Sequence, residues 1–72
     1  MNKKITKKAR SLILSYDKQG WNPTQYEFDK INQIGIFSFM HENGNVMNIL
    51  VDYFNNKILV YINNKLKDSI IL

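Results

Sequence analysis

Three asparagine-rich dipeptides divide the second half of the chain into short apolar runs. They are Asn43-Gly44, Asn55-Asn56 and Asn63-Asn64, whose first residues lie 12 and 8 positions apart. Asn and Gly tolerate the positive φ angles that tight hairpins require. Because the runs between these turns are rich in β-branched and aromatic residues, the spacing predicts an antiparallel β-meander of three to four strands over residues 34–72.

A helical pattern occupies the N-terminal segment, from residue 3 to about residue 18. Apolar side chains recur there at spacings of three and four, which places on one helical face Ile5, Ala9, Leu12, Ile13 and Tyr16. Leu14 breaks the pattern, because it lies nearly opposite Ile5 on the helix, and Gly20 suits the C-terminal stop. The sequence therefore predicts an α+β fold in one domain, residues 1–72, with an N-terminal amphipathic helix packed on the meander.

The segment 19–33 between helix and meander gives two conflicting signals. Asn22-Pro23 resembles a helix N-cap followed by proline at the first helical position. Alternation around Tyr26 and Phe28 would also suit a strand. We expect a short helix or an irregular crossover here, with Trp21 at the junction packed in the core.

The turns also predict how the strands pair. A two-residue turn at Asn43-Gly44 places Ile36 opposite Val51, and one at Asn55-Asn56 places Val51 opposite Val60. For the last strand we expect a three-residue turn that includes Lys65 and aligns Ile70 with Ile58. These pairings define a core face that the helix covers.

With this register, the opposite face of the sheet is also rich in apolar side chains. It would carry Phe37, Phe39, Leu50, Phe54, Leu59 and Tyr61, with Asn48, Asp52 and His41 between them. Either residues 20–33 cover this face, or it is an apolar patch that awaits a partner. A homodimer closed through Phe37, Phe39, Leu50 and Tyr61 is one such possibility.

Charge is concentrated at the N-terminus. The net charge is +4, and five of the ten basic residues are Lys3, Lys4, Lys7, Lys8 and Arg10, which leaves five lysines against six carboxylates in the other 62 residues. No apolar run has the length of a signal-peptide core, about 7–15 residues, or of a membrane span, about 18 residues. We therefore expect a soluble, cytoplasmic protein. The Asn-, Ile- and Lys-rich composition with a single Arg is typical of a low-GC bacterium or its phage, so the expected location is the bacterial cytoplasm.

The residue types that enzymes and metal sites need are scarce. There is no cysteine, and the single His41 lies beside a turn, where we expect it to be exposed to solvent. The carboxylates are scattered and the three glycines stand alone, so neither an acid–base pair nor a phosphate loop is indicated. We expect no catalytic, metal or cofactor site, and a protein that is not an enzyme.

Two kinds of binding remain. In the first, the basic helix KKITKKAR contacts phosphates, and aromatic residues of the sheet stack on bases. In the second, the outer side of the helix binds a protein. Arg, Tyr and Trp often anchor such interfaces, and the candidate contact residues are Lys7, Arg10, Ser11, Leu14, Tyr16, Asp17 and Trp21.

The opening KKITKKARSLILSYD, with the length and the Asn-, Ile- and Lys-rich composition, resembles the small antirepressors, or modulators of repression, of temperate lactococcal phages such as TP901-1. The resemblance covers the whole chain. It implies a partner, the CI-type repressor of the phage, which would be bound through its N-terminal helix-turn-helix domain. Hiding the DNA-reading helix would block operator binding and favour lytic growth.

The basic N-terminus conflicts in part with this implied partner. DNA-binding surfaces are usually basic, so five positive charges in the first ten residues would be repelled by one. Either the lysines point away and Asp17, Glu27 or Asp29 faces the repressor, or the basic helix contacts DNA in a ternary complex.

Overall fold

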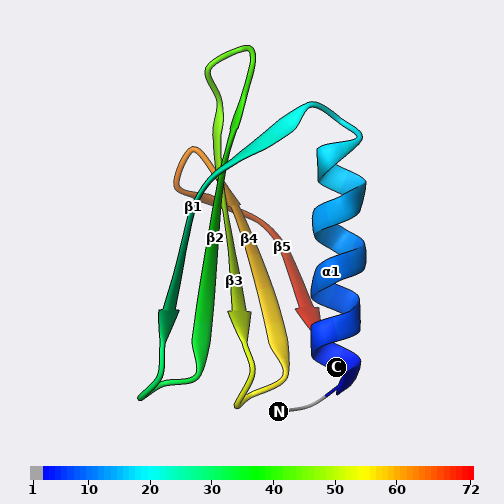
Figure 1. The fold of residues 1–72 in the computed structure, drawn as a ribbon, viewed down its shortest axis with the longest axis vertical. Coiled ribbons are helices and arrows are strands. Elements are labelled where there is room, and N and C mark those ends of the chain that lie inside the picture. The colour runs from blue at the N-terminus through cyan, green and yellow to red at the C-terminus, as the bar shows by residue number, and fades with distance from the viewer. Residues whose placement is uncertain (1–2) are drawn as a thin grey trace.

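The computed structural model describes residues 3–72 as one helix packed on a five-stranded antiparallel sheet (Figure 1). Each strand pairs with its neighbours in sequence, in the order β1-β2-β3-β4-β5. The predicted α+β architecture is confirmed, with five strands where three to four were expected. Within residues 3–72, no helix is long and apolar enough to span a membrane. The elements are α1 (Lys3–Asp17), β1 (Trp21–Asp29), β2 (Ile34–His41), β3 (Val46–Asp52), β4 (Lys57–Ile62) and β5 (Lys65–Ile71).

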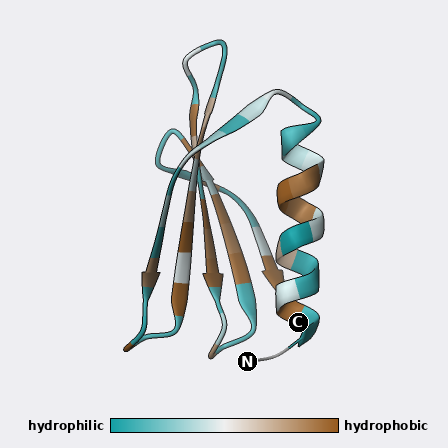
Figure 2. Cartoon of the chain, viewed as in Figure 1, coloured by the Kyte–Doolittle hydropathy of each residue, from teal (hydrophilic) through white to brown (hydrophobic). Residues whose placement is uncertain are grey.

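The helix buries the face that its sequence predicts. Ile5 and Ala9 are buried, and Leu12, Ile13 and Tyr16 pack against the same core. Figure 2 shows apolar and polar residues alternating along α1. After Asp17 the chain turns at Gly20, whose φ of 93° is the left-handed conformation that glycine adopts most easily.

The centre of the core lies on β3 and β4. Alternate side chains of these strands point towards α1, and none of the following is exposed at all: Met47, Ile49, Val51, Ile58 and Val60. Phe39 of β2 and Trp21 of β1 complete this layer, with exposed fractions of 2% and 7%. The expectation that Trp21 packs in the core is therefore confirmed.

The expected helix or crossover at 19–33 is wrong, because most of this segment is strand β1. It pairs with β2 from Trp21, opposite His41, to Asp29, opposite Ile34. Pro23 is tolerated because β1 is an edge strand, where a missing N–H breaks no essential ladder bond. The register shifts between Pro23 and Gln25, so the strand bulges just after the proline.

The predicted register of β2 against β3 is wrong by one residue. The turn holds three residues, 42–44, closed by a hydrogen bond from the His41 N–H to the Asn45 carbonyl oxygen at 2.9 Å, with Gly44 at φ 92°. Ile36 therefore lies opposite Leu50 instead of Val51. A shift of one residue turns every side chain of β2 to the other face.

The later turns change the register less. A four-residue turn, 53–56, places Val51 opposite Ile58 instead of Val60, a shift of two that leaves the faces unchanged. The last turn contains two residues, Asn63 and Asn64, both with positive φ, instead of the expected three. Ile70 still lies opposite Ile58 as predicted, because the register shifts between Val60 and Tyr61.

The corrected register divides the proposed dimer contact between two faces. Phe37 and Phe39 lie opposite Ile49 and Met47 on the helix-covered face, whereas Leu50 and Tyr61 lie on the other. These four residues therefore do not form one surface. Of the other residues expected on that outer face, Phe54 lies in an exposed turn, and His41, opposite Trp21, lies on the helix-covered face. Asp52, opposite Ile34, lies on the outer face as expected and is buried.

Candidate functional site

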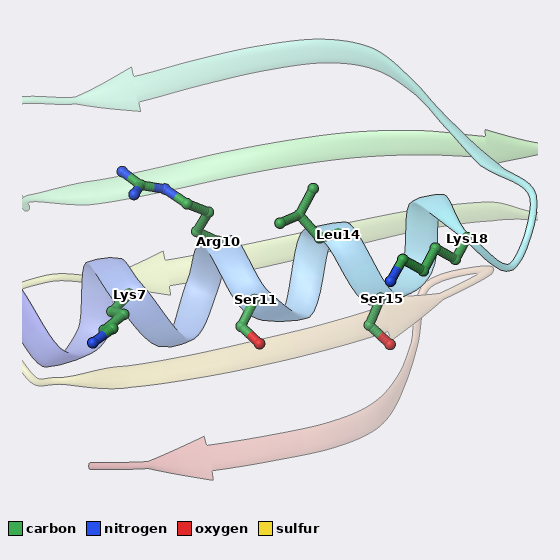
Figure 3. A pocket seen from close by; sticks show the side chains of 6 residues that line it. All are labelled: Lys7, Arg10, Ser11, Leu14, Ser15 and Lys18. Carbon is green, nitrogen blue, oxygen red and sulfur yellow. The ribbon is translucent and has the colours of Figure 1, made fainter.

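A shallow hollow of about 520 Å³ follows the solvent side of α1. In Figure 3, Arg10 and Leu14 point towards the side of β1 and β2, whereas Ser11 and Ser15 point towards β4. Six residues, which we call the outer-helix surface, line this hollow: Lys7, Arg10, Ser11, Leu14, Ser15 and Lys18.

Leu14 is the apolar centre of the outer-helix surface. Its side chain is 56% exposed although the opposite side of the same helix is anchored in the core. Arg10 lies one turn before it and Lys18 one turn after it, so a partner would meet an apolar side chain between two cations. The two small serines leave space on the remaining flank.

Four of the seven predicted contact residues meet on this surface: Lys7, Arg10, Ser11 and Leu14. Ser15 and Lys18 were not predicted, although each lies four residues after a predicted member and so on the same helical face. The other three lie elsewhere. Tyr16 is on the inner side, Asp17 is exposed at the helix end, and Trp21 is buried.

Tyr16 lies on the inner side of α1 and is partly buried, unlike the exposed residues of the outer-helix surface. Burial raises the pKa of its phenol, and the nearby carboxylate of Asp68 on β5 raises it further. The ring thus lies at the β5 side of the helix–sheet junction. It helps to fix α1 on the sheet and is only partly accessible to a partner.

The charged residues of α1 are almost all basic. No acidic residue lies in its first turn, and Asp17 is its one carboxylate. A second hollow, lined by Lys4, Lys7, Lys8, Ser11 and the C-terminal Leu72, extends the cationic area towards the start of the helix. The helix N-terminus adds a partial positive charge of its own, so this region attracts anionic groups.

A third hollow, of about 270 Å³, lies between α1 and the sheet. It is lined by Thr6, Ala9, Arg10, Ile13, Leu14, Phe37 and Tyr53. Beyond it, Tyr26 and Phe28 of β1 stand 55% and 36% exposed. We call this hollow and the two β1 rings the β1-side groove. The sequence did not reveal it, because β1 was not expected to be a strand.

Aromatic contacts hold the groove together. The rings of Tyr26 and Phe37 lie 4.7 Å apart between centroids, and those of Phe28 and Tyr53 lie 6.1 Å apart in an edge-on arrangement. Burial raises the pKa of Tyr53, and the neighbouring Tyr26 raises it further. The two phenol groups are therefore close enough to interact in the same part of the groove.

The carboxylates on the turns have structural roles. Asp29 accepts hydrogen bonds from the backbone N–H groups of Ile31 and Asn32, at 2.9 and 3.2 Å. Asp52 accepts two from Asn55, both at 2.9 Å. The Asn32 and Asn55 side chains are the main reason that the pKa of each aspartate is lowered. Both carboxylates therefore stabilise turns, and the hydrogen bonds that they accept there favour their charged form.

His41 is half-buried, contrary to the expected solvent exposure. Its ring packs edge-on against Trp21 with centroids 5.2 Å apart, and its Nε2 lies 3.0 Å from the Gln19 carbonyl oxygen. It therefore ties the helix end to the sheet. Among residues 3–72, no group of three or more His, Cys, Asp or Glu side chains is placed to hold a metal ion.

Comparison with protein-family models, curated proteins and solved structures finds no match to this chain.

Proposed function

We propose that this protein is a non-enzymatic regulator that binds the helix-turn-helix domain of a CI-type phage repressor and competes with operator DNA. In a phage-infected bacterial cell this would favour lytic growth. The observation that carries the proposal is Leu14, a half-exposed apolar side chain between Arg10 and Lys18 on a helix whose other side is fixed in the core. The resemblance of the opening segment to phage antirepressors supplies the identity of the partner.

An apolar centre favours a protein partner over a phosphate backbone. Burying a leucine side chain contributes about 1.5–3 kcal/mol, and a charged phosphate backbone offers no apolar surface that would bury it. The surrounding cations then require carboxylates on the partner beside its apolar contact. Such a pattern fits the edge of a DNA-binding domain better than its basic centre.

The position of the acidic residues bears on how the two proteins would meet. Glu27 pairs with Ile36 on the sheet face away from α1, and Asp29 closes a turn. Asp17, exposed at the end of α1, is the carboxylate nearest to the outer-helix surface in sequence. In the proposed complex, Asp17 would face the basic part of the repressor and Arg10 an acidic part.

The experiment is a gel-shift series with labelled operator DNA that carries bound repressor. We expect the wild-type protein to release or supershift the repressor complex and to leave bare DNA unshifted. Leu14→Ala should require at least tenfold more protein, because truncating a central interface residue costs about 2 kcal/mol. The matched control is Leu66→Ala, since Leu66 is 57% exposed on the other face of the sheet. Equal activity of both variants would refute the role of Leu14.

Direct nucleic-acid binding is the second candidate function. It is favoured by the lysine-lined hollow at the start of α1, formed by Lys4, Lys7 and Lys8. Binding through six or more phosphate contacts should weaken by about 10³-fold or more between 50 and 200 mM salt. If the protein alone shifts DNA and salt abolishes the shift, this second function replaces the first.

A further inference from the structure

The helical layer over the sheet is incomplete. Figure 3 shows α1 crossing in front of β3 and β4, with β1 and β2 on one side. Of β1, only Trp21 is buried, and every later residue of the strand is exposed. A single helix about 10 Å wide covers roughly two strands at a spacing of about 4.8 Å. The helix-side face of β1 and part of β2 are therefore left open.

The open part has the width of one further helix. The distance across the sheet from the line between β3 and β4 to β1 is two to three strand spacings, or about 10–14 Å. Helices that pack side by side keep their axes about 8–10 Å apart. A second helix lying over β1 and β2 would thus contact α1 along its length.

The lining of the β1-side groove is apolar in its floor and cationic at its rim. Phe37 and Tyr53 form the floor, and Ala9 and Ile13 form the wall on the side of α1. Arg10 also lines the hollow, and no ion pair joins it to a carboxylate among residues 3–72. No acidic side chain lines this hollow.

We propose that the β1-side groove receives one amphipathic helix of the partner protein, which completes the helical layer beside α1. Apolar side chains of that helix enter between Leu14 and Tyr26, and a carboxylate on it faces Arg10. This inference rests on the proposed function and names the structural element that is recognised. Helix-in-groove binding of this kind is anchored by residues at spacings of three and four.

Charge argues against a second copy of this chain as the occupant. Its α1 would bring another row of lysines and an arginine against Arg10, and like charges in contact oppose association. A helix that carries carboxylates beside its apolar stripe avoids this repulsion. The occupant is therefore a different protein with an acidic amphipathic helix.

The test measures the affinity of full-length variants for the N-terminal domain of a CI-type repressor by titration calorimetry. We expect Tyr26→Ala and Phe28→Ala each to weaken binding by about tenfold, since both rings border the groove. Leu66→Ala is the control of matched exposure. Arg10→Glu should weaken binding further, and exchanging a carboxylate of the partner helix for lysine should restore it.

The outcomes separate the two proposals. If Leu14→Ala weakens binding while Tyr26→Ala and Phe28→Ala bind like wild type, the proposed function stands and the groove inference is refuted. If the wild-type protein does not bind the repressor domain, both fail. If single-stranded DNA binds instead and depends on Tyr26, the groove is a base-stacking surface and the helix occupant is refuted.

Discussion

The two halves of the sheet differ in how completely they are covered. On β3 and β4, the side chains that face α1 are wholly buried, as at Ile49 and Val60. On β1, the same face carries Tyr26 and Phe28, which remain 55% and 36% exposed. One helix thus closes the core over one half and leaves an aromatic surface over the other. β1 therefore adds less to the core than to the surface that a partner can reach.

This comparison predicts where truncation destabilises the fold most. Ile49→Ala should lower the free energy of unfolding by about 2–5 kcal/mol, because it leaves a cavity at the centre of the closed half. Urea denaturation followed by circular dichroism measures the change. A loss below about 1 kcal/mol would show that the closed half is not the stabilising half.

The turn between α1 and β1, where Gly20 lies beside His41, predicts an effect of intermediate size. An alanine at Gly20 would have to keep a φ of 93°, and its Cβ would lie 3.0 Å from His41 Nε2. An alanine at Gly44 would have to keep a similar φ, 92°, but its Cβ would have no atom within 4 Å. Gly44→Ala should cost about 1–2 kcal/mol from backbone strain alone. Gly20→Ala should cost about 1 kcal/mol more, because His41 must move from Trp21. Equal thermal midpoints for the two variants would contradict this contact.

The turn on the closed half predicts a pH dependence. Hydrogen bonds from Asn55 lower the pKa of Asp52 in the folded state, so the stabilisation is complete above the unfolded pKa of about 3.9. It is lost as the pH falls through the lower folded value. Asp52→Ala should destabilise by about 1–2 kcal/mol at pH 7, and thermal midpoints should show this difference shrinking in acid. A difference that stays constant between pH 7 and pH 2 would contradict the assignment.

The smallest expected effect is on the open half. Tyr26→Ala should lower the free energy of unfolding by about 1 kcal/mol or less, because the half-exposed ring contributes mainly through its contact with Phe37. The same denaturation experiment measures it beside Ile49→Ala. A loss as large as that of Ile49→Ala would mean that β1 belongs to the core, and the contrast between the halves would disappear.

The sequence predicts the parts whose pattern has one solution. The helix is one, because Ile5, Ala9 and Tyr16 repeat at helical spacing and the outer positions are polar. The core face of β3 is another, since its buried apolar residues alternate with Asn48 and Leu50, and pairing with β3 then sets the core face of β4. Leu14 was found on the exposed side because it alone departs from the helical pattern.

The remaining errors have physical causes. In β2, both alternating sets are largely apolar, with Ile34 and Ile36 in one and Phe37 and Phe39 in the other. Hydrophobic pattern therefore cannot choose the register, and one extra turn residue inverts it. β1 was missed because its edge position accepts a proline that resembles a helix start. The groove depends on β1, so it was missed with it.

The contact surface can be mapped directly on the ¹⁵N-labelled full-length protein by NMR. A CI-type repressor N-terminal domain is added, and amide shifts are followed. We predict the largest changes in α1 from Lys7 to Lys18 and in β1 around Tyr26, with little change around Leu59 and Leu66 on the opposite face. Changes concentrated on that opposite face, or none at saturating repressor, would contradict the claim that this protein acts through α1 and the groove beside it.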